Sequence, residues 1–147
     1  AWLSRNSNKK STLKGWFASL GGQVVEVRVE GEARYLLAEH EDELAATQPS
    51  RATCLLGAFD QFVLGPGTKD THMLANEHRS RVSKAAGWIA PVLTQGGRIT
   101  GVWEMDDGDL VVTPFPGEQA PSSKALEDAA ARLAAVHGLV KVTPRVG

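Results

Sequence analysis

The amino-terminal third of the chain shows two hydrophobic patterns in succession. Residues 12–20, TLKGWFASL, carry apolar side chains at the spacing of one helix face, and Ser11 or Thr12 stands where an N-cap belongs. In residues 23–37, valines alternate with charged residues before a Glu-Gly turn, and a second apolar run follows it. These patterns predict a short helix and then a two-stranded hairpin with one buried face.

This order of helix and hairpin is that of the second half of a winged helix, although many α+β folds contain the same pair. Residues 38–48 are polar and predict a short helix, after which Pro49 and Ser50 indicate a domain boundary. We therefore expect residues 1–48 to be the carboxy-terminal half of a winged-helix unit. Residues 51–147 would then form a second domain.

The second domain shows short apolar runs separated by turn residues, followed by one long helical pattern. Residues 122–138 contain good helix formers, with Ser122 or Ser123 as the N-cap and Gly138 at the end. The apolar stripe expected on this helix is Leu126, Ala129, Ala130, Leu133 and Val136. Strands are expected at residues 52–59, 88–94, 98–105, 110–115 and 139–143, with a helical turn near Asn76.

The strand expected at residues 98–105 alternates between apolar and mixed positions. One face of the strand would carry Ile99, Gly101, Trp103 and Met105. The opposite face would carry Thr100, Val102 and Glu104. One face is therefore predicted to be core. Alternation also predicts that Trp88 and Trp103 are core aromatics, although both could instead stack on nucleic-acid bases.

The composition is that of an ordinary folded protein. The chain has 147 residues, 42% of them hydrophobic and 22% charged, which allows one domain or a fragment plus a small domain. It begins Ala-Trp-Leu without an initiating Met, so we expect a part of a longer protein. No apolar run approaches the ~20 residues of a membrane-spanning helix and no secretory signal is evident, which favours a cytoplasmic protein without a membrane partner.

Charge is unevenly distributed, although the net charge is only −1. Basic residues gather at Arg5, Lys9, Lys10 and Lys14 near the amino terminus and again at Lys69, Arg79, Arg81, Lys84 and Arg98. Such clusters are most often solvated surface, but they can also bind phosphates.

Asp60 is the most conspicuous candidate for chemistry, because it interrupts an apolar run between two phenylalanines. A general base normally works beside a second polar group, and none is near Asp60 in the sequence. We interpret Asp60 as a structural residue that caps backbone groups or pairs with a basic side chain at a bend. Gly65-Pro66-Gly67, which follows, lacks the Lys-Ser/Thr pair of a phosphate loop and is expected to be a turn.

The residue types that can bind metals are scattered along the chain. Cys54 is the single cysteine, and the four histidines fall in separate segments as His40, His72, His78 and His137. This spacing argues against a zinc site, and Cys54 is expected to be a buried, inert thiol. We expect no metal and no cofactor.

Three segments of the second domain together resemble a known family. They are LLGAFDQFVLG at residues 55–65, HRSRV at residues 78–82 and GWIAPVLTQGGRITGVWE at residues 87–104. Their order and spacing are similar to the carboxy-terminal part of the bacterial winged-helix DNA-binding family that includes the alkylpurine and crosslink-unhooking DNA glycosylases. The resemblance implies an α+β fold in two parts. The first part is the remnant of a winged helix and consists of its last helix and wing hairpin. The second part is a compact β-rich, barrel-like domain with a C-terminal helix.

The chain departs from the family pattern at two places. The family's arginine, in a segment resembling YRDR after the first run, is absent, and Lys69 replaces it only in part because lysine lacks the bidentate fork. The catalytic signature, Gln-aliphatic-Asp or Gln-aliphatic-Gln, is absent after every glutamine: Gln23, Gln48, Gln61, Gln95 and Gln119. The resemblance therefore implies that catalysis belongs to an upstream part of the parent protein and that this chain holds no catalytic residue.

The hypothesis that results is a DNA-binding fragment of a multi-winged-helix protein, whose parent is a DNA glycosylase acting in base-lesion or crosslink repair. The fragment would bind the backbone of double-stranded DNA and act as a scaffold beside the upstream winged-helix domains. The alternative is a purely structural or dimerisation domain without DNA contact. The residues expected to contact DNA are Lys9, Lys10, Ser11, Lys14, Lys69, Arg79, Arg81 and Lys84.

Overall fold

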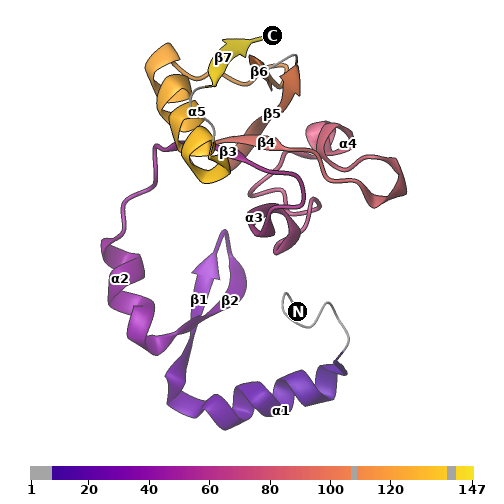
Figure 1. Cartoon of the computed structure of the whole chain (residues 1–147). Coiled ribbons are helices and arrows are strands. Elements are labelled where there is room, and N and C mark those ends of the chain that lie inside the picture. The colour runs from indigo at the N-terminus through magenta and orange to yellow at the C-terminus, as the bar shows by residue number, and fades with distance from the viewer. Residues whose placement is uncertain (1–7, 107–108, 139–141) are drawn as a thin grey trace. The chain divides into compact units, whose positions relative to one another are not determined.

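The chain folds as an α+β protein in two units, Ala1–Pro49 and Ser50–Gly147 (Figure 1). The computed structural model describes residues 8–106, 109–138 and 142–147. None of the helices in these ranges has the length and apolar character needed to cross a membrane.

The first unit consists of a helix, a hairpin and a short second helix. Its elements are α1 (Lys10–Leu20), η1 (Gly21–Gln23), β1 (Val24–Val29), β2 (Glu32–Leu37), η2 (Ala38–His40) and α2 (Glu41–Ala46). The hairpin is antiparallel, as its alternating valines predict. The predicted cap of the first helix is wrong, because α1 begins before Ser11 and Lys9 occupies the N-cap position without a side-chain cap. Ser11 therefore lies inside the first turn.

The first unit has little core of its own. No residue between 8 and 49 is fully buried, and the valines predicted to form the buried face of the hairpin are only half-buried or exposed. Phe17 of α1 contacts Tyr35 of β2 at a ring-centroid distance of 4.9 Å, which contributes about 0.5–1.5 kcal/mol. Trp16 next to it remains 53% exposed.

The second unit is a curled five-stranded sheet with one long helix and several short ones. The strands, in the order of the sheet, are β3 (Thr53–Leu56), β4 (Val92–Gln95), β5 (Arg98–Asp106), β6 (Asp109–Pro114) and β7 (Thr143–Val146). The helices are α3 (Gln61–Leu64), η3 (Asn76–His78), α4 (Arg79–Val82), η4 (Ala85–Gly87) and α5 (Ser123–His137). Neighbouring strands are antiparallel except β6 and β7, which are parallel because α5 forms the crossover between them.

Several predicted elements of this unit are confirmed, and others are shorter than predicted. The strand at residues 110–115 and the helical turn near Asn76 are present. The strand expected at 52–59 ends at Leu56, and the one expected at 88–94 begins only at Val92. Of the strand expected at 139–143, residues 139–141 lie outside the described residues, and β7 begins at Thr143.

The long helix α5 has the termini that its sequence predicts. The Ser122 hydroxyl accepts a hydrogen bond from the backbone N–H of Ala125 at 3.2 Å, and Gly138 takes the left-handed conformation at φ 67°. Its buried stripe differs from the prediction at two positions, because Ala134 is buried and Val136 is 82% exposed. The helix therefore buries mostly small side chains, which lets it lie close to the sheet.

Two apolar clusters form the core of the second unit. The first lies between α5 and the sheet and contains Leu55, Leu93, Leu110, Val112, Leu126, Ala129, Ala130, Ala134 and Val142. The second joins the sheet to the segment from α3 to α4 and contains Val63, Met73, Leu74, Val82, Ile89, Val92, Ile99 and Phe115. Each fully buried aliphatic side chain contributes about 1.5–3 kcal/mol, so the two clusters carry most of the stability of this unit.

A β-bulge in β5 determines which side chains enter each cluster. Leu93 pairs with Gly101 but Thr94 pairs with Ile99, which leaves Thr100 as an extra residue in β5. Ile99 and Val102 consequently both contact the second cluster, while Trp103 packs against the first. The predicted alternation along this strand is therefore wrong across the bulge, because strict alternation would place Ile99 and Val102 on opposite faces.

Of the two tryptophans predicted to lie in the core, one does and one does not. Trp103 is partly buried, and its indole N–H donates to the carbonyl of Leu56 at 2.9 Å, so its structural role is confirmed. Trp88 is 51% exposed, so its predicted core position is wrong. The reason is that Trp88 precedes Pro91 and lies in a loop closed by a bridge between Ser83 and Ile89, outside the sheet.

Gly101 allows β5 and β6 to approach each other where the bulge ends. A Cβ atom at this position would lie 2.6 Å from the carbonyl oxygen of Thr113 and 3.0 Å from the Cα atom of Pro114. Both are backbone atoms that cannot rotate away. We expect Gly101→Ala to lower the free energy of unfolding by about 1–3 kcal/mol, measured by urea denaturation.

Gly57→Ala is the matched control for this prediction, because nothing lies within 4 Å of a Cβ atom added there. We expect its free energy of unfolding to stay within about 0.5 kcal/mol of the original chain. Equal stability of the two variants would contradict the close approach at Gly101.

Candidate nucleic-acid interface

The basic residues expected to contact DNA in the first unit gather at the start of α1. Lys9 lies at the N-cap position, Lys10 and Ser11 lie in the first turn, and Lys14 follows one turn later. All four are exposed. Because residues four apart share a helix face, Lys10 and Lys14 project from the same side of α1.

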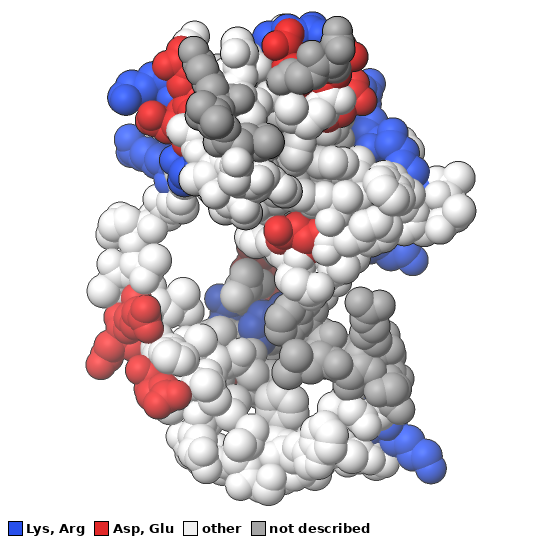
Figure 2. Space-filling model, in the orientation of Figure 1, with Lys and Arg blue, Asp and Glu red and all other residues white. Residues whose placement is uncertain are grey.

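The electrostatic surroundings of this group favour an anion. The helix α1 contains no acidic residue, and its N-terminus adds partial positive charge from unpaired backbone N–H groups. The acidic residues of this unit gather on another element, as Figure 2 shows over α2, whose first turn holds Glu41, Asp42 and Glu43. No acid on their own helix therefore competes with a phosphate for the lysines of α1.

The basic residues of the second unit are less uniform. Arg81 and Lys84 are exposed beside α4, and buried Val82 fixes that short helix against the second cluster. Arg79 is only half-exposed, and its Nε atom is buried without a hydrogen-bond partner among the described residues. Lys69 is exposed in the loop after α3. At α4, Arg81 and Lys84 are thus more accessible to a ligand than Arg79.

Other cations of the chain are already engaged within the protein. Arg28, Arg34, Lys124 and Arg145 form ion pairs with Glu26, Glu32, Asp128 and Asp106, respectively. The guanidinium groups of Arg98 and Arg132 donate to the carbonyls of His72 and Thr53. In the described part of the chain, the six exposed lysines and arginines proposed to contact DNA have no such ion pair, so their charge is available to a ligand.

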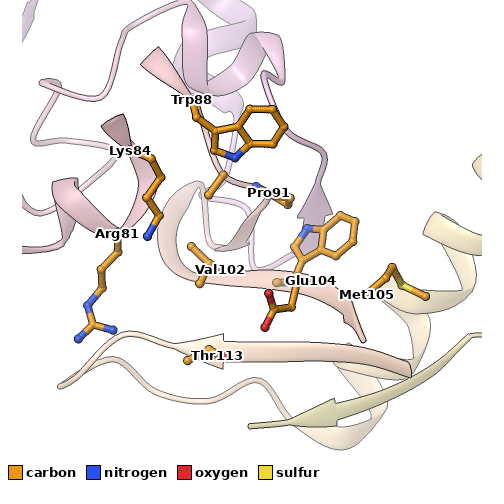
Figure 3. A pocket seen from close by; sticks show the side chains of 10 residues that line it. Arg81, Lys84, Trp88, Pro91, Val102, Glu104, Met105 and Thr113 are labelled. Carbon is orange, nitrogen blue, oxygen red and sulfur yellow. The ribbon is translucent and has the colours of Figure 1, made fainter. Parts of the chain in front are cut away.

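Arg81 and Lys84 line a pocket together with Trp88 (Figure 3). The pocket has a volume of about 430 Å³, and its apolar wall includes Pro91, Val102 and Trp103. The sequence predicts Arg81 and Lys84 as DNA contacts and gives base stacking as the alternative role of Trp88, but it does not predict the pocket that joins them, because it assigns Trp88 to the core face of a strand. The available signal was the proline at position 91, which breaks that strand.

Asp60 acts as a helix cap. Its carboxylate accepts a hydrogen bond from the backbone N–H of Phe62 at 2.8 Å and so begins α3. The turn predicted after this helix is present, with Gly67 at φ 86°. The structural interpretation of Asp60 is therefore confirmed.

The metal-binding side chains stay apart from one another. No three His, Cys, Asp or Glu side chains of residues 8–106, 109–138 and 142–147 gather where they could hold a metal ion. His40 contacts Glu43 at 3.2 Å and His72 contacts Asp70 at 3.0 Å, each beside a neighbour in sequence. His78 is buried, with its ring 4.5 Å from that of Phe115.

The sequence from residue 1 to residue 136 matches the family described as DNA glycosylase AlkZ-like, and the chain belongs to this family. The chain is 51% identical over 145 residues to the interstrand DNA cross-link repair glycosylase of Streptomyces sahachiroi. Its fold is similar to the solved structure of Streptomyces sahachiroi DNA glycosylase AlkZ, with a TM-score of 0.94 over 99% of this chain. The chain spans 39% of the length of these relatives. The resemblance to DNA glycosylases is therefore confirmed at the level of the family.

The capping geometry generates a prediction for Asp60. Asp60→Ala removes the acceptor for the Phe62 N–H, so we expect the free energy of unfolding to fall by about 0.5–2 kcal/mol. Asp60→Asn keeps an acceptor oxygen at the same place. It should lower the free energy of unfolding, measured by chemical denaturation, by only about a few tenths of a kcal/mol. A loss of DNA affinity in Asp60→Asn without a loss of stability would contradict the structural role.

Proposed function

We propose that this chain is the DNA-contacting and scaffolding part of a DNA glycosylase that acts in base-lesion or crosslink repair. The observation that carries the proposal is the 51% identity, over nearly the whole chain, to an interstrand DNA cross-link repair glycosylase. Identity at this level across 99% of the chain supports a shared role for the matched part.

We propose further that residues 1–48 are the carboxy-terminal half of a winged-helix unit and residues 51–147 a β-rich domain. Support for the first assignment is the order of α1, β1 and β2 together with the basic group at the start of α1. In a winged helix, the helix before the hairpin is the one that enters the major groove, and the hairpin approaches the backbone.

Base excision would belong to a part of the parent outside this chain. A glycosylase extrudes its target nucleotide into a pocket, and the family's Gln-aliphatic-Asp or Gln-aliphatic-Gln signature occurs at no glutamine here. The remaining task for this chain is affinity for double-stranded DNA. Upstream winged-helix domains are the partners that this division of tasks requires.

The DNA contacts we propose are electrostatic. Lys9, Lys10, Ser11 and Lys14 of the first unit would meet phosphates, as would Lys69, Arg79, Arg81 and Lys84 of the second. Neutralising each phosphate releases condensed counterions, so affinity falls with salt and is nearly independent of sequence.

A second candidate function is structural, and one observation favours it. The first unit leaves large apolar side chains in solvent, with Trp16 53%, Leu44 54% and Tyr35 58% exposed. Such a surface suits packing against another protein surface, from the same chain or from a second copy. Absence of DNA binding together with concentration-dependent dimerisation would favour this function over DNA contact.

The proposed electrostatic contacts predict that DNA affinity depends on salt and that removing the lysines weakens this dependence. Replacing Lys9, Lys10 and Lys14 by Glu should weaken binding to duplex DNA at least about tenfold. It should also lower the slope of log affinity against log salt by about 3, near one for each phosphate that is no longer neutralised. Fluorescence anisotropy with labelled duplex at several salt concentrations measures both quantities.

The control for that series is a matched single charge reversal. Lys84 belongs to the proposed contact set. Lys124 lies on α5, where it pairs with Asp128 at 3.5 Å. We expect Lys84→Glu to weaken binding several-fold and Lys124→Glu to leave it within about twofold. Equal effects of the two reversals would show that only net charge matters.

The division of catalysis predicts where activity is found. The intact parent protein should release an alkylated base from duplex DNA, and the 147-residue chain alone should release none, because it lacks the catalytic signature. Quantifying the freed base by chromatography checks both. Base release by the chain alone would overturn the assignment of catalysis to another part of the parent.

A further inference from the structure

We propose that the pocket beside Trp88 binds an unstacked nucleotide of DNA, with its base against the exposed indole and a phosphate between Arg81 and Lys84. This inference rests on the proposed DNA-binding function and extends it. The contact set above addresses the regular backbone of a duplex, whereas this pocket would hold a single nucleotide that has left the base stack.

The position of Trp88 is fixed although half of its surface is exposed. The backbone N–H of Lys84 donates to the carbonyl of Trp88 at 2.8 Å, and the N–H of Ala90 donates to the carbonyl of Val82 at 2.9 Å. These bonds and the Ser83–Ile89 bridge close the loop on both sides of the tryptophan. An aromatic ring held in place in solvent loses little conformational entropy when a base stacks on it.

A second aromatic ring supports the indole. The ring of Phe59 meets that of Trp88 in a T-shaped contact, with centroids 5.0 Å apart and planes at 85°. Phe59 itself is 42% exposed, so the pair forms an aromatic surface that belongs to neither apolar cluster of the core. The contact orients Trp88 without burying it.

The backbone around Trp88 is strained. Among the described residues, three residues other than glycine have positive φ, and two of them adjoin the tryptophan: Phe59 at φ 59° and Ala86 at φ 55°. Such conformations cost about 1–3 kcal/mol each and persist where the surrounding structure enforces them, which happens often at ligand sites. Here the strained residues accompany an exposed aromatic ring.

The lining of the pocket matches the parts of a nucleotide. Figure 3 shows Arg81 and Lys84 along one side of the pocket, Trp88 and Pro91 along another and the carboxylate of Glu104 across from the cations. Lysine and arginine bind phosphate, a tryptophan face stacks on any base, and a carboxylate accepts from the exocyclic amino group of cytosine. The volume of about 430 Å³ lies within the range of small-ligand sites.

The combination of charges selects this occupant over an apolar one. Two cations and one acid around an aromatic wall would leave unpaired charges beneath a purely apolar segment, which costs free energy. A nucleotide supplies a partner for each: an anion for the cations, an amino group for the acid and a flat ring for the indole.

The test compares two duplexes that differ by one nucleotide, so that one is fully paired and the other carries a single unpaired cytosine. We expect the chain to bind the second about tenfold more tightly in anisotropy titrations, because base–aromatic stacking adds to the backbone contacts. Trp88→Ala should abolish this preference while leaving affinity for the paired duplex unchanged, and Trp88→Phe should retain most of it. Trp16→Ala, which removes the other strongly exposed tryptophan of the described residues, should preserve the ratio.

The outcomes separate this inference from the proposed function. Equal affinity for the two duplexes, or a preference that survives Trp88→Ala in a variant with an unchanged unfolding midpoint, overturns the pocket inference and leaves duplex binding standing. If neither duplex binds, the proposed function fails. Binding of a short oligodeoxycytidylate then tests the pocket inference by itself. Binding of that single strand that Trp88→Ala abolishes supports the inference, and absence of such binding overturns it.

Discussion

The β-bulge at Thr100, with the close approach at Gly101 beside it, is the constraint on which the second unit depends. The extra residue turns β5 so that Ile99 and Val102 serve one apolar cluster and Trp103 serves the other. Bulges bend a strand and increase its twist, which suits a sheet that curls. One curled face receives α5, and the other receives the segment from α3 to α4, which carries the basic residues and ends near Trp88.

Local signals explain which parts of this fold the sequence could predict. The helix α5 is predictable because Ser122 and Gly138 mark its ends, and the cap at Asp60 is predictable because a short acid in a turn accepts backbone N–H groups. The bulge is not predictable in the same way, because it is defined by the register with β4. Periodicity misplaces Trp88 and Val136 for a related reason: it gives a face, but the neighbouring elements decide whether that face is covered.

The first unit forms the elements that its patterns predict without forming the core that they predict. Its helix and hairpin are present, yet no residue from 8 to 49 is buried, and a single aromatic pair joins α1 to β2. Isolated helices of this length and isolated hairpins are marginally stable in water. The predicted buried face is therefore an apolar surface that residues 8–49 do not cover by themselves.

Net charge is a poor guide to DNA binding in a chain of this kind. A net charge of −1 suggests no attraction to a polyanion, but screening limits each exposed charge to about 10 Å at moderate salt, so local groups decide. Arg28, Arg34 and Arg145 are each neutralised by an acid, whereas the lysines at the start of α1 and the pair at the Trp88 pocket are not. Part of the basic residues thus pairs with acids of the same fold, and another set of exposed cations is left without an ion pair in the described part of the chain. It is this exposed set, and not the sum over the chain, that a phosphate backbone would meet.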